Sequence, residues 1–487
     1  MLLFERTARH RGLQSRLLPS IIEAFVNFTF AFSVPADTDI FRSLPKSRMA
    51  KPTRLTKDMI EAYVTQGYWQ PGTIADTLSR HSRRFPDKTA VVDSGTRITW
   101  SRLEAITDTV AVRLLSSYAD RDQVIAAQLP NSINSIVFLL ACQKAGIISC
   151  FVPLTFRHTE AAEVLKQLKP TTLITAGHYE GFDYHSMARA ARRTIPQLKH
   201  LMVAGDAAAA GIPRFEDLYA SPAPLTEIEQ HLPQFTFGLF EMSSVMLGTS
   251  TTTGLPTFVE HTGASSLAAG KGLNQRTHLT RTDTSVNLSP LSGAPGMQNW
   301  WAAFLLGAAT CFPNPGIPDQ ALQIIQQENI RYLALEPDQL TRILEETNLS
   351  AYDLSSLRVI RIDAASLDPA VILEAEGRIG STVLIAAGTE ETYSFAQSDL
   401  DDPDKKRLST VGRGFPGDEL KIVSSSGAVL PPGKAGRLLV RGATTSSGYF
   451  QDLETTLAAW GTLGNEGWYA PGYTAMLDSS GYLTILK

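Results

Sequence analysis

The sequence predicts an α/β protein in which helices alternate with strands of parallel-rich sheets, followed by a β-rich region. From Thr73 to Gly388, helical patterns of apolar residues alternate with short runs of Val, Ile and Leu, which is typical of βα units. After Arg413 the chain changes to short strands separated by Gly and Pro. Its 487 residues exceed what one core usually supports. We therefore expect two βα subdomains plus a small β-barrel subdomain.

The first 48 residues differ from the rest of the chain. Four arginines precede an apolar stretch, Leu17 to Val34, which is interrupted by Pro19, Glu23 and Asn27. A signal peptide or a membrane span needs an unbroken apolar segment, so no stable membrane span is expected and the cytoplasm is the expected location. The alternatives for this extension are a segment without structural role, such as an over-long reading of the gene, and a transit or membrane-attachment segment.

The first βα units follow in order. A helix over 73–85 ends before Pro86, and the runs 88–93 and 96–100 form a strand pair. The next helix, over 101–118, is predicted to open with a capping box formed by Ser101 and Glu104. Further strands are expected over 124–130, 148–154, 171–176 and 200–205, with helices over 133–146 and 160–170.

The same alternation resumes after a long loop. Helices are expected over 265–276, 297–307, 318–330 and 337–348, and strands over 309–313, 331–336 and 382–388. The last of these strands ends at Gly388, and open α/β sheets bind ligands at the carboxyl ends of their strands. This end of the sheet is therefore a predicted ligand site.

Composition excludes several classes of protein. Hydrophobic residues make up 43% of the chain and charged residues 19%, as in a globular protein. A net charge of −4 provides no basic surface for nucleic acid, so no nucleic-acid partner is expected. Cys142, Cys150 and Cys311 lack the spacing of a zinc site or a disulfide framework, and we expect them to be small buried residues.

The segment 243–262 is an apolar strand followed by a loop of small hydroxyl and glycine residues. Such a loop exposes backbone N–H groups without side-chain bulk, which suits a polyphosphate. Composition alone favours the alternative, an ordinary Ser/Thr-rich surface loop. Further motifs are needed to decide.

Those motifs carry a family resemblance. Residues 249–256 resemble the phosphate-binding motif TSGTTGxPKG of the superfamily of acyl-CoA synthetases, adenylation domains and luciferases. GYW at 67–69, FPD at 85–87 and QLPN at 128–131 resemble the opening of its aryl- and alicyclic-acid branch. VGRGFPG at 411–417, PPGKAGRLLVRG at 431–442, SGYFQDLETT at 447–456 and GWYAPGYTAMLDSSGYL at 467–483 resemble its later motifs. The resemblance runs from Gly67 to the last residue, in the family's order.

The resemblance implies an ATP-dependent ligase that activates a small carboxylic acid. The carboxylate attacks the α-phosphate of ATP held with magnesium (Mg²⁺), pyrophosphate leaves, and the acyl-adenylate passes its acyl group to CoA or to the phosphopantetheine arm of a carrier protein. Secondary metabolism is the implied setting. The implied domains are the extension 1–48, an AMP-binding α/β core over 49–410 and a β-rich subdomain over 411–487 that ends at a hinge.

The resemblance also implies site residues. It assigns nucleotide binding to Thr249, Ser250, Thr251, Thr252, Thr253, Gly254, Gly388, Thr389, Glu390 and Tyr473. Glu391 takes the metal position of the motif YGxTE, because Mg²⁺ prefers carboxylate oxygens; the alternative is a simple cap. The family's layout places the acid pocket at Gly293, Ala294, Gly296, Asp363 and Ala364, where the small residues indicate room. Trp300 and Trp301 are expected in the core.

Several positions depart from the family pattern. Thr257 replaces a lysine of the phosphate loop, Glu390 replaces a threonine, and Gly293 replaces a histidine found in many members. Tyr473 stands where an Asp accepts both ribose hydroxyls, and charged hydrogen bonds of this kind are worth about 1.5–3 kcal/mol each. The chain ends at Lys487, where relatives continue into a lid domain with a catalytic lysine.

These departures leave alternatives open. The resemblance implies no catalytic residue within this chain, so the lid is expected to be lost by truncation or to come from another protein. The competing interpretation is a non-catalytic relative that binds a nucleotide, an acyl compound or a partner protein.

Overall fold

The computed structural model describes residues 54–70, 72–205, 211–232, 243–247, 257–461 and 467–486. The chain divides into two compact units, Met1–Lys51 and Pro52–Lys487, and every described residue belongs to the second. The predicted extension over 1–48, the loop residues Thr249, Ser250, Thr251, Thr252, Thr253 and Gly254, and Lys487 all lie outside the described residues.

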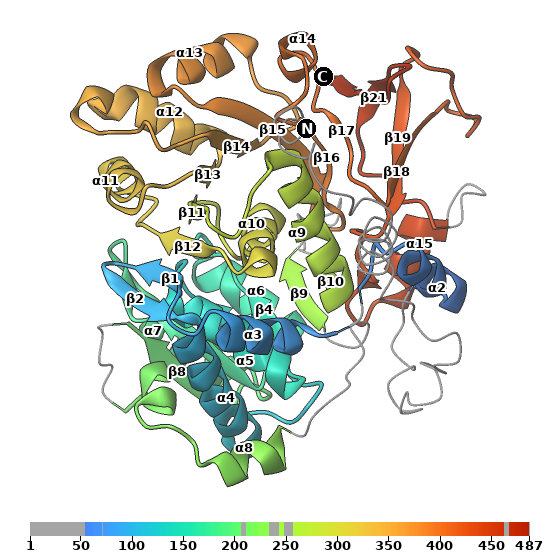
Figure 1. Ribbon diagram of the computed structural model, residues 1–487. Helices are drawn as coiled ribbons and strands as arrows, with labels where there is room; N and C mark the ends of the chain where they lie inside the picture. Colours follow the sequence, from blue (N-terminus) through green and yellow to red (C-terminus); the bar gives the residue numbers. More distant parts are fainter. Residues whose placement is uncertain are drawn as a thin grey trace, which may run out of the picture. The chain divides into compact units, whose positions relative to one another are not determined.

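The larger sheet has nine strands in the order β17-β16-β15-β14-β13-β11-β12-β1-β2 (Figure 1). The strands from β15 to β1 in this order pair in parallel, and β2, β16 and β17 add antiparallel edges. Their bounds are β1 Thr89–Asp93, β2 Thr96–Thr99, β11 Thr284–Asn287, β12 Ala309–Phe312, β13 Tyr332–Leu335, β14 Val359–Asp363, β15 Thr382–Thr389, β16 Tyr393–Gln397 and β17 Arg413–Gly414. The central strands are buried along most of their length because helices cover both faces of a parallel sheet.

The second sheet has seven strands in the order β20-β10-β9-β4-β3-β5-β8. In this sheet β8, β5, β3, β4 and β9 pair in parallel, and β10 and β20 add antiparallel pairs. Its bounds are β3 Val124–Gln128, β4 Ile148–Phe151, β5 Thr172–Ala176, β8 His200–Ala204, β9 Ser243–Leu247, β10 Phe258–Thr262 and β20 Gly448–Tyr449. A separate short hairpin joins β6 His178–Tyr179 to β7 Phe182–Asp183. The two parallel-rich sheets confirm the predicted α/β class.

Helices alternate with these strands as predicted. Their bounds are α2 Lys57–Thr65, α3 Ile74–Arg84, α4 Trp100–Ser117, α5 Ile133–Ala145, α6 His158–Leu168, α7 Tyr184–Thr194, α8 Leu225–His231, α9 Gly263–Thr277, α10 Ala294–Leu306, α11 Pro318–Glu328, α12 Pro337–Glu346, α13 Pro369–Ile379, α14 Asp404–Arg407 and α15 Leu453–Gly461, with 3-10 turns at Phe215–Tyr219 and Leu349–Ala351. Helices α9 and α10 pack closely, since a Cβ on Gly270 would lie 2.6 Å from the carbonyl carbon of Trp301. Trp300 and Trp301 are fully buried, which confirms their predicted place in the core.

The predicted start of α4 is wrong. The helix begins at Trp100, and its N-cap is Thr99, whose side chain accepts a hydrogen bond from the Arg102 backbone at 3.2 Å. Ser101 is already helical and donates instead to the Pro86 carbonyl at 2.8 Å. Glu104 contacts Ser79 and Lys144 on neighbouring helices, so tertiary partners compete with the capping box.

The β-rich region forms a four-stranded antiparallel sheet rather than the expected barrel within the described residues. Its order is β18-β19-β21-β22, with bounds β18 Asp418–Val423, β19 Gly436–Gly442, β21 Thr474–Leu477 and β22 Leu483–Leu486. The sheet stays open in this order because β17 and β20, from the same region, pair with β16 and β10 of the two larger sheets. The region is thereby joined to both parallel-rich sheets, and the predicted boundary at residue 410 stays a prediction.

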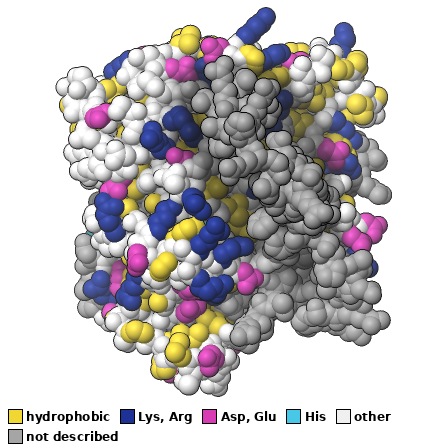
Figure 2. Space-filling model, viewed as in Figure 1, with side chains coloured by type: hydrophobic (Ala, Val, Ile, Leu, Met, Phe, Trp, Pro, Cys, Tyr) yellow, Lys and Arg dark blue, Asp and Glu magenta, His cyan; other side chains and the backbone are white. Residues whose placement is uncertain are grey.

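Two predictions from composition can be compared with the structure. Cys142, Cys150 and Cys311 are free and buried as predicted, and burial raises the pKa of Cys150 to about 12. Across the described part of the chain, no helix is long and apolar enough to cross a bilayer. Figure 2 shows Lys and Arg side chains gathered on the face over α3 and α4, so the net charge of −4 is unevenly distributed.

Candidate functional site

The candidate site lies at the turn between β15 and β16, where Glu390 and Glu391 follow the carboxyl end of a parallel strand. Gly388 allows the two strands to approach, because a Cβ there would lie 1.9 Å from the Tyr393 carbonyl oxygen. Tyr393 adopts φ 53° and is held by a 2.9 Å contact between its hydroxyl and that of Ser266. The predicted ligand-binding edge of the sheet therefore presents two carboxyl groups on a tightly fixed turn.

Glu391 is buried beside phenols. Its side chain is 8% exposed, and its Oε1 accepts a hydrogen bond from the Tyr449 hydroxyl at 3.0 Å. Burial raises the pKa of Tyr449 and of Tyr469, and the charge of Glu391 adds to both shifts, so the phenols stay protonated. Among the ion pairs of the described residues, none involves Glu391. A buried carboxylate without a cationic side chain fits the needs of a hard divalent cation.

Glu390 has a structural partner. Its Oε2 accepts a hydrogen bond from the backbone N–H of Ala294 at 2.8 Å, at the first residue of α10. The N-cap of that helix is Gly293, which has no side chain to cap it, so Glu390 supplies the acceptor at the positive end of the helix. Burial raises the pKa of Glu390 to about 8, against the effect of the Ala294 hydrogen bond. A role of Glu390 in nucleotide binding stays a prediction.

The predicted acid-pocket residues fall into two groups. Gly293 and Ala294 lie against Glu390: a Cβ on Gly293 would be 3.5 Å from its Oε1. Gly296 does not leave room for a ligand, and that inference is wrong, because a Cβ there would lie 2.1 Å from the Pro290 carbonyl oxygen. The structure thus brings the start of α10 to the β15–β16 turn and uses Gly296 for close backbone packing.

Asp363 and Ala364 end the neighbouring strand, β14. The backbone N–H of Ala364 donates to the Ala386 carbonyl on β15 at 2.8 Å. The two carboxylate oxygens of Asp363 each lie 2.8 Å from a nitrogen of Arg361, whose side chain is fully buried. Burial raises the pKa of Asp363, and Arg361 opposes that shift. The Asp363 carboxylate is therefore held by an ion pair with the buried Arg361.

Sequence reasoning missed Arg361 and its partners. Its guanidinium also donates to Gln298, Asn299, Ser394 and Gln397 at distances of 2.6–3.0 Å. The signal was present: an arginine in the middle of the apolar strand 359–363 must find buried partners.

His261 was also missed. It is fully buried on β10, with Nε2 2.8 Å from the Glu390 carbonyl oxygen and Nδ1 3.1 Å from the Ser265 hydroxyl. Burial lowers its pKa to about 3, so the ring is neutral and holds the turn in place. Its position just after the predicted phosphate loop was the available signal.

Tyr473 and Thr257 lie at the borders of the site. Tyr473 is half-buried, with its ring centroid 6.0 Å from that of Phe395, and burial raises its pKa, with Glu391 adding to the shift. Thr257 precedes β10 directly and is half-buried. A role of Tyr473 in nucleotide binding stays a prediction.

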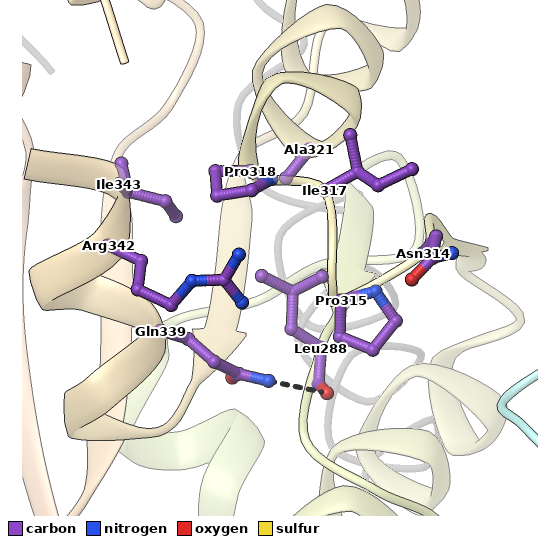
Figure 3. Close-up of a pocket in the computed structure, with 9 residues that line it drawn as sticks. All are labelled: Leu288, Asn314, Pro315, Ile317, Pro318, Ala321, Gln339, Arg342 and Ile343. Carbon is purple, nitrogen blue, oxygen red and sulfur yellow. Dashed lines mark hydrogen bonds between the residues drawn. The ribbon is translucent and has the colours of Figure 1, made fainter. Parts of the chain in front are cut away.

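Two hollows lie away from these residues. Figure 3 shows one of 210 Å³ between α11 and α12, crossed by a 3.3 Å hydrogen bond from Gln339 to the Leu288 carbonyl oxygen. A larger one of 1310 Å³, part of it open to solvent, lies at the carboxyl ends of β3, β5 and β8. Neither hollow is lined by a residue predicted for the site. The candidate site is therefore defined by the residues of the β15–β16 turn and not by either hollow.

Comparison with known sequences gives one family match. The family described as "AMP-binding enzyme" matches residues 78–450. The chain belongs to the AMP-binding enzyme family. The match covers the β15–β16 turn, β10 and β20, and so includes every residue around Glu391 except Tyr469 and Tyr473.

Curated relatives of this AMP-binding enzyme have informative names. It is 29% identical over 430 residues to the medium-chain fatty-acid–CoA ligase of Escherichia coli, covering 87% of this chain and 74% of that protein. It is 24% identical over 434 residues to the 2,3-dihydroxybenzoate-AMP ligase of Bacillus subtilis, covering 88% of this chain and 77% of that protein.

A solved structure confirms the fold. The apo structure of MbtA from Mycobacterium smegmatis matches with a TM-score of 0.79 and 23% identity, covering 91% of this chain and 80% of that one. At this identity the likeness concerns the fold of the AMP-binding enzyme alone.

Proposed function

We propose that this AMP-binding enzyme activates a small carboxylic acid with ATP. A carboxylate oxygen attacks the α-phosphorus of ATP, the bond to pyrophosphate breaks, and the acyl-adenylate then gives its acyl group to a thiol of CoA or of a carrier protein. Both relatives named above are ligases, one forming a CoA product and one an AMP product by name. The first name supports CoA as the acceptor, and a further relative named as a salicyl-AMP ligase and salicyl-S-ArCP synthetase supports a carrier-protein thiol.

The observation that carries the proposal is the buried Glu391 carboxylate. Tyr449 orients one of its oxygens, and no described ion pair neutralises its charge. When bound there, Mg²⁺ would supply charge stabilisation for the phosphate oxygens during displacement. Gly388 and His261 hold the turn that carries Glu391, so the carboxylate is positioned before any ligand arrives.

For the acid, we propose an aryl or alicyclic compound. The start of α10 presents only the hydrogen of Gly293 and the methyl group of Ala294 beside the β15–β16 turn, and many members of the family carry a histidine at the Gly293 position. Relatives named for salicylate and for a substituted naphthoate support this class. We also propose a setting in secondary metabolism, which is compatible with these names.

Hydroxylamine trapping tests the proposal, because it converts any acyl-adenylate to a hydroxamate. The purified chain is incubated with Mg·ATP and benzoate, salicylate, cyclohexanecarboxylate or octanoate. We expect hydroxamate from at least one aryl or alicyclic acid, dependent on ATP and Mg²⁺. ATP binding without hydroxamate from any acid would contradict the proposal and favour the non-catalytic alternative.

A further inference from the structure

A cluster of two histidines and one aspartate lies outside the candidate site, on the β6–β7 hairpin and the first turn of α7. His178 and Asp183 are directly opposite each other in the hairpin register, and His185 follows two residues after Asp183. The ligand atoms of the three side chains all lie within 4.8 Å of one another. The proposed ligase reaction does not use these residues.

The two faces of the hairpin are chemically different. Side chains alternate along a strand, so the opposed pair Tyr179 and Phe182 point away from His178 and Asp183. Tyr179 and Phe182 pack on the apolar cluster beneath, and the guanidinium of Arg157 lies 4.2 Å from the Phe182 ring. The Arg157 guanidinium is therefore on the face opposite His178 and Asp183.

The distances suit a metal ion. Asp183 Oδ1 lies 2.8 Å from His185 Nδ1, and Asp183 Oδ2 lies 3.8 Å from His178 Nε2. Zinc binds such donors at about 2.0–2.2 Å, which at tetrahedral angles separates two donors by about 3.4 Å, between the two observed values.

Two further observations support a ligand. His185 Nδ1 is a buried atom without a hydrogen-bond partner in the described structure, although Asp183 lies close to it. The Asp183 carboxylate also accepts a hydrogen bond from the Ser186 backbone at 3.0 Å as the N-cap of α7. Such an outer contact orients a metal-binding carboxylate.

We propose that His178, Asp183 and His185 bind a divalent transition-metal ion such as Zn²⁺, with water completing the coordination. Two imidazoles and one carboxylate favour this class over Mg²⁺, which prefers oxygen donors alone. The ion joins the hairpin to α7. It also stands at the rim of the 1310 Å³ hollow, which His178 helps to line.

A second group of the same type serves as an internal comparison. His278 lies 3.5 Å from both Asp399 and Asp401. However, Asp399 is already paired with Arg276 at 3.0 Å, so part of its charge is neutralised by the protein itself. We therefore expect the His178 group, and not the His278 group, to bind the ion.

Cobalt titration tests this assignment, since Co²⁺ substitutes for Zn²⁺ and has visible absorption. The tag-free, metal-stripped full chain is titrated with Co²⁺, then with Zn²⁺ as competitor. We expect one ion per chain, displaced by Zn²⁺. His178→Ala, His185→Ala and Asp183→Asn should each weaken binding at least tenfold, and asparagine preserves the cap of α7. The matched control is His158→Ala, which removes a nearby exposed histidine whose ring makes an edge-to-face contact with Phe182.

Melting temperatures separate binding from misfolding. Zn²⁺ should raise the melting temperature of the unaltered chain and of His158→Ala, and leave that of His185→Ala unchanged, while all variants keep the same circular dichroism spectrum. Absence of Co²⁺ binding by the unaltered chain would overturn the proposal. So would unchanged affinity in His185→Ala or loss of binding in a His278→Ala variant.

Discussion

Two buried charges near the carboxyl end of the larger sheet have opposite surroundings. Arg361, with Gln298, Asn299, Asp363, Ser394 and Gln397, forms a network in which the guanidinium meets both an opposite charge and neutral acceptors. Glu391, with Tyr449 and Tyr469, forms a cluster in which phenols face a carboxylate and no cation neutralises it in the described ion pairs.

This difference distinguishes a structural role for Arg361 from the binding role proposed for Glu391. A buried charge that the protein itself pairs completely is not available to a ligand. Removing one partner leaves the other charge buried and unpaired, so the full free energy of its desolvation then destabilises the fold. A buried carboxylate held only by neutral donors retains its charge for a cation from solution. We therefore assign the Arg361 network to stability and the Glu391 cluster to binding.

The largest expected effect is on stability. Arg361→Met leaves Asp363 buried without its cation, and we expect the free energy of unfolding to fall by about 3–5 kcal/mol. The matched control is Arg378→Met, because Arg378 is 41% exposed and pairs with Glu374 one helical turn away. Its effect should stay within about 0.5 kcal/mol. Urea unfolding followed by circular dichroism measures both; equal losses would remove the distinction between the two regions.

The second effect is on activity. Glu391→Gln keeps an acceptor for Tyr449 but removes the charge, so hydroxamate formation should fall about a hundredfold, equivalent to about 2.7 kcal/mol. Stability in urea should change little. Tyr449→Phe, which removes the hydrogen bond but not the charge, is the matched variant and should lose about tenfold. A Glu391→Gln enzyme with full activity would place the metal elsewhere.

A smaller effect is expected on nucleotide affinity. Tyr473→Asp creates an acceptor for two ribose hydroxyls, and the dissociation constant for Mg·ATP should fall about tenfold. The nearby charge of Glu391 keeps the gain from being larger. Tyr473→Asn introduces a side chain of the same size as aspartate but without its charge, so its affinity for Mg·ATP should increase less. Calorimetry distinguishes them, and weaker binding by the Asp variant would mean that Tyr473 lies away from the ribose.

The smallest expected effect is on the pH dependence of stability, and it involves the buried residue His81. His81 on α3 is 6% exposed, and its Nε2 lies 2.8 Å from the Phe304 carbonyl oxygen. Burial lowers its pKa to about 4, below the ordinary value of 6.5. The unfolded chain therefore binds the proton more readily, and stability is lost as pH falls from 6.5 towards 4. In the His81→Gln variant, the decrease in the free energy of unfolding between pH 7 and pH 4.5 should be smaller by about 1–2 kcal/mol. An unchanged loss would show that other groups cause it.

Local patterns predicted most of the fold. The alternation of helices and strands was predicted from Thr73 to Gly388 because each βα unit carries its own periodicity, and α5 and α11 lie close to their expected bounds. The cap of α4 was wrong because neighbouring helices bind Glu104, which no local rule contains. Among the described residues, strands β18, β19, β21 and β22 form an antiparallel sheet with no closed barrel detected, and β17 and β20 of the same region pair with distant strands, which local patterns do not predict.

The site was predicted only in part. Motif order led to the prediction of Glu391 as the metal-binding residue, and that role stays a prediction. Tyr449 and His261 reach the β15–β16 turn from β20 and β10, and Arg361 lies in the sheet below, so their roles depend on pairings between distant segments. Gly296 shows the converse: a small residue indicated room, whereas the backbone of Pro290 fills the space.

The most direct test of the central claim is the Mg²⁺ dependence of ATP binding, measured by calorimetry on the unaltered chain and on Glu391→Gln. The assignment of Glu391 predicts that Mg²⁺ tightens ATP binding by the unaltered chain at least tenfold and has little effect in the variant. Equal Mg²⁺ dependence in both proteins would contradict it.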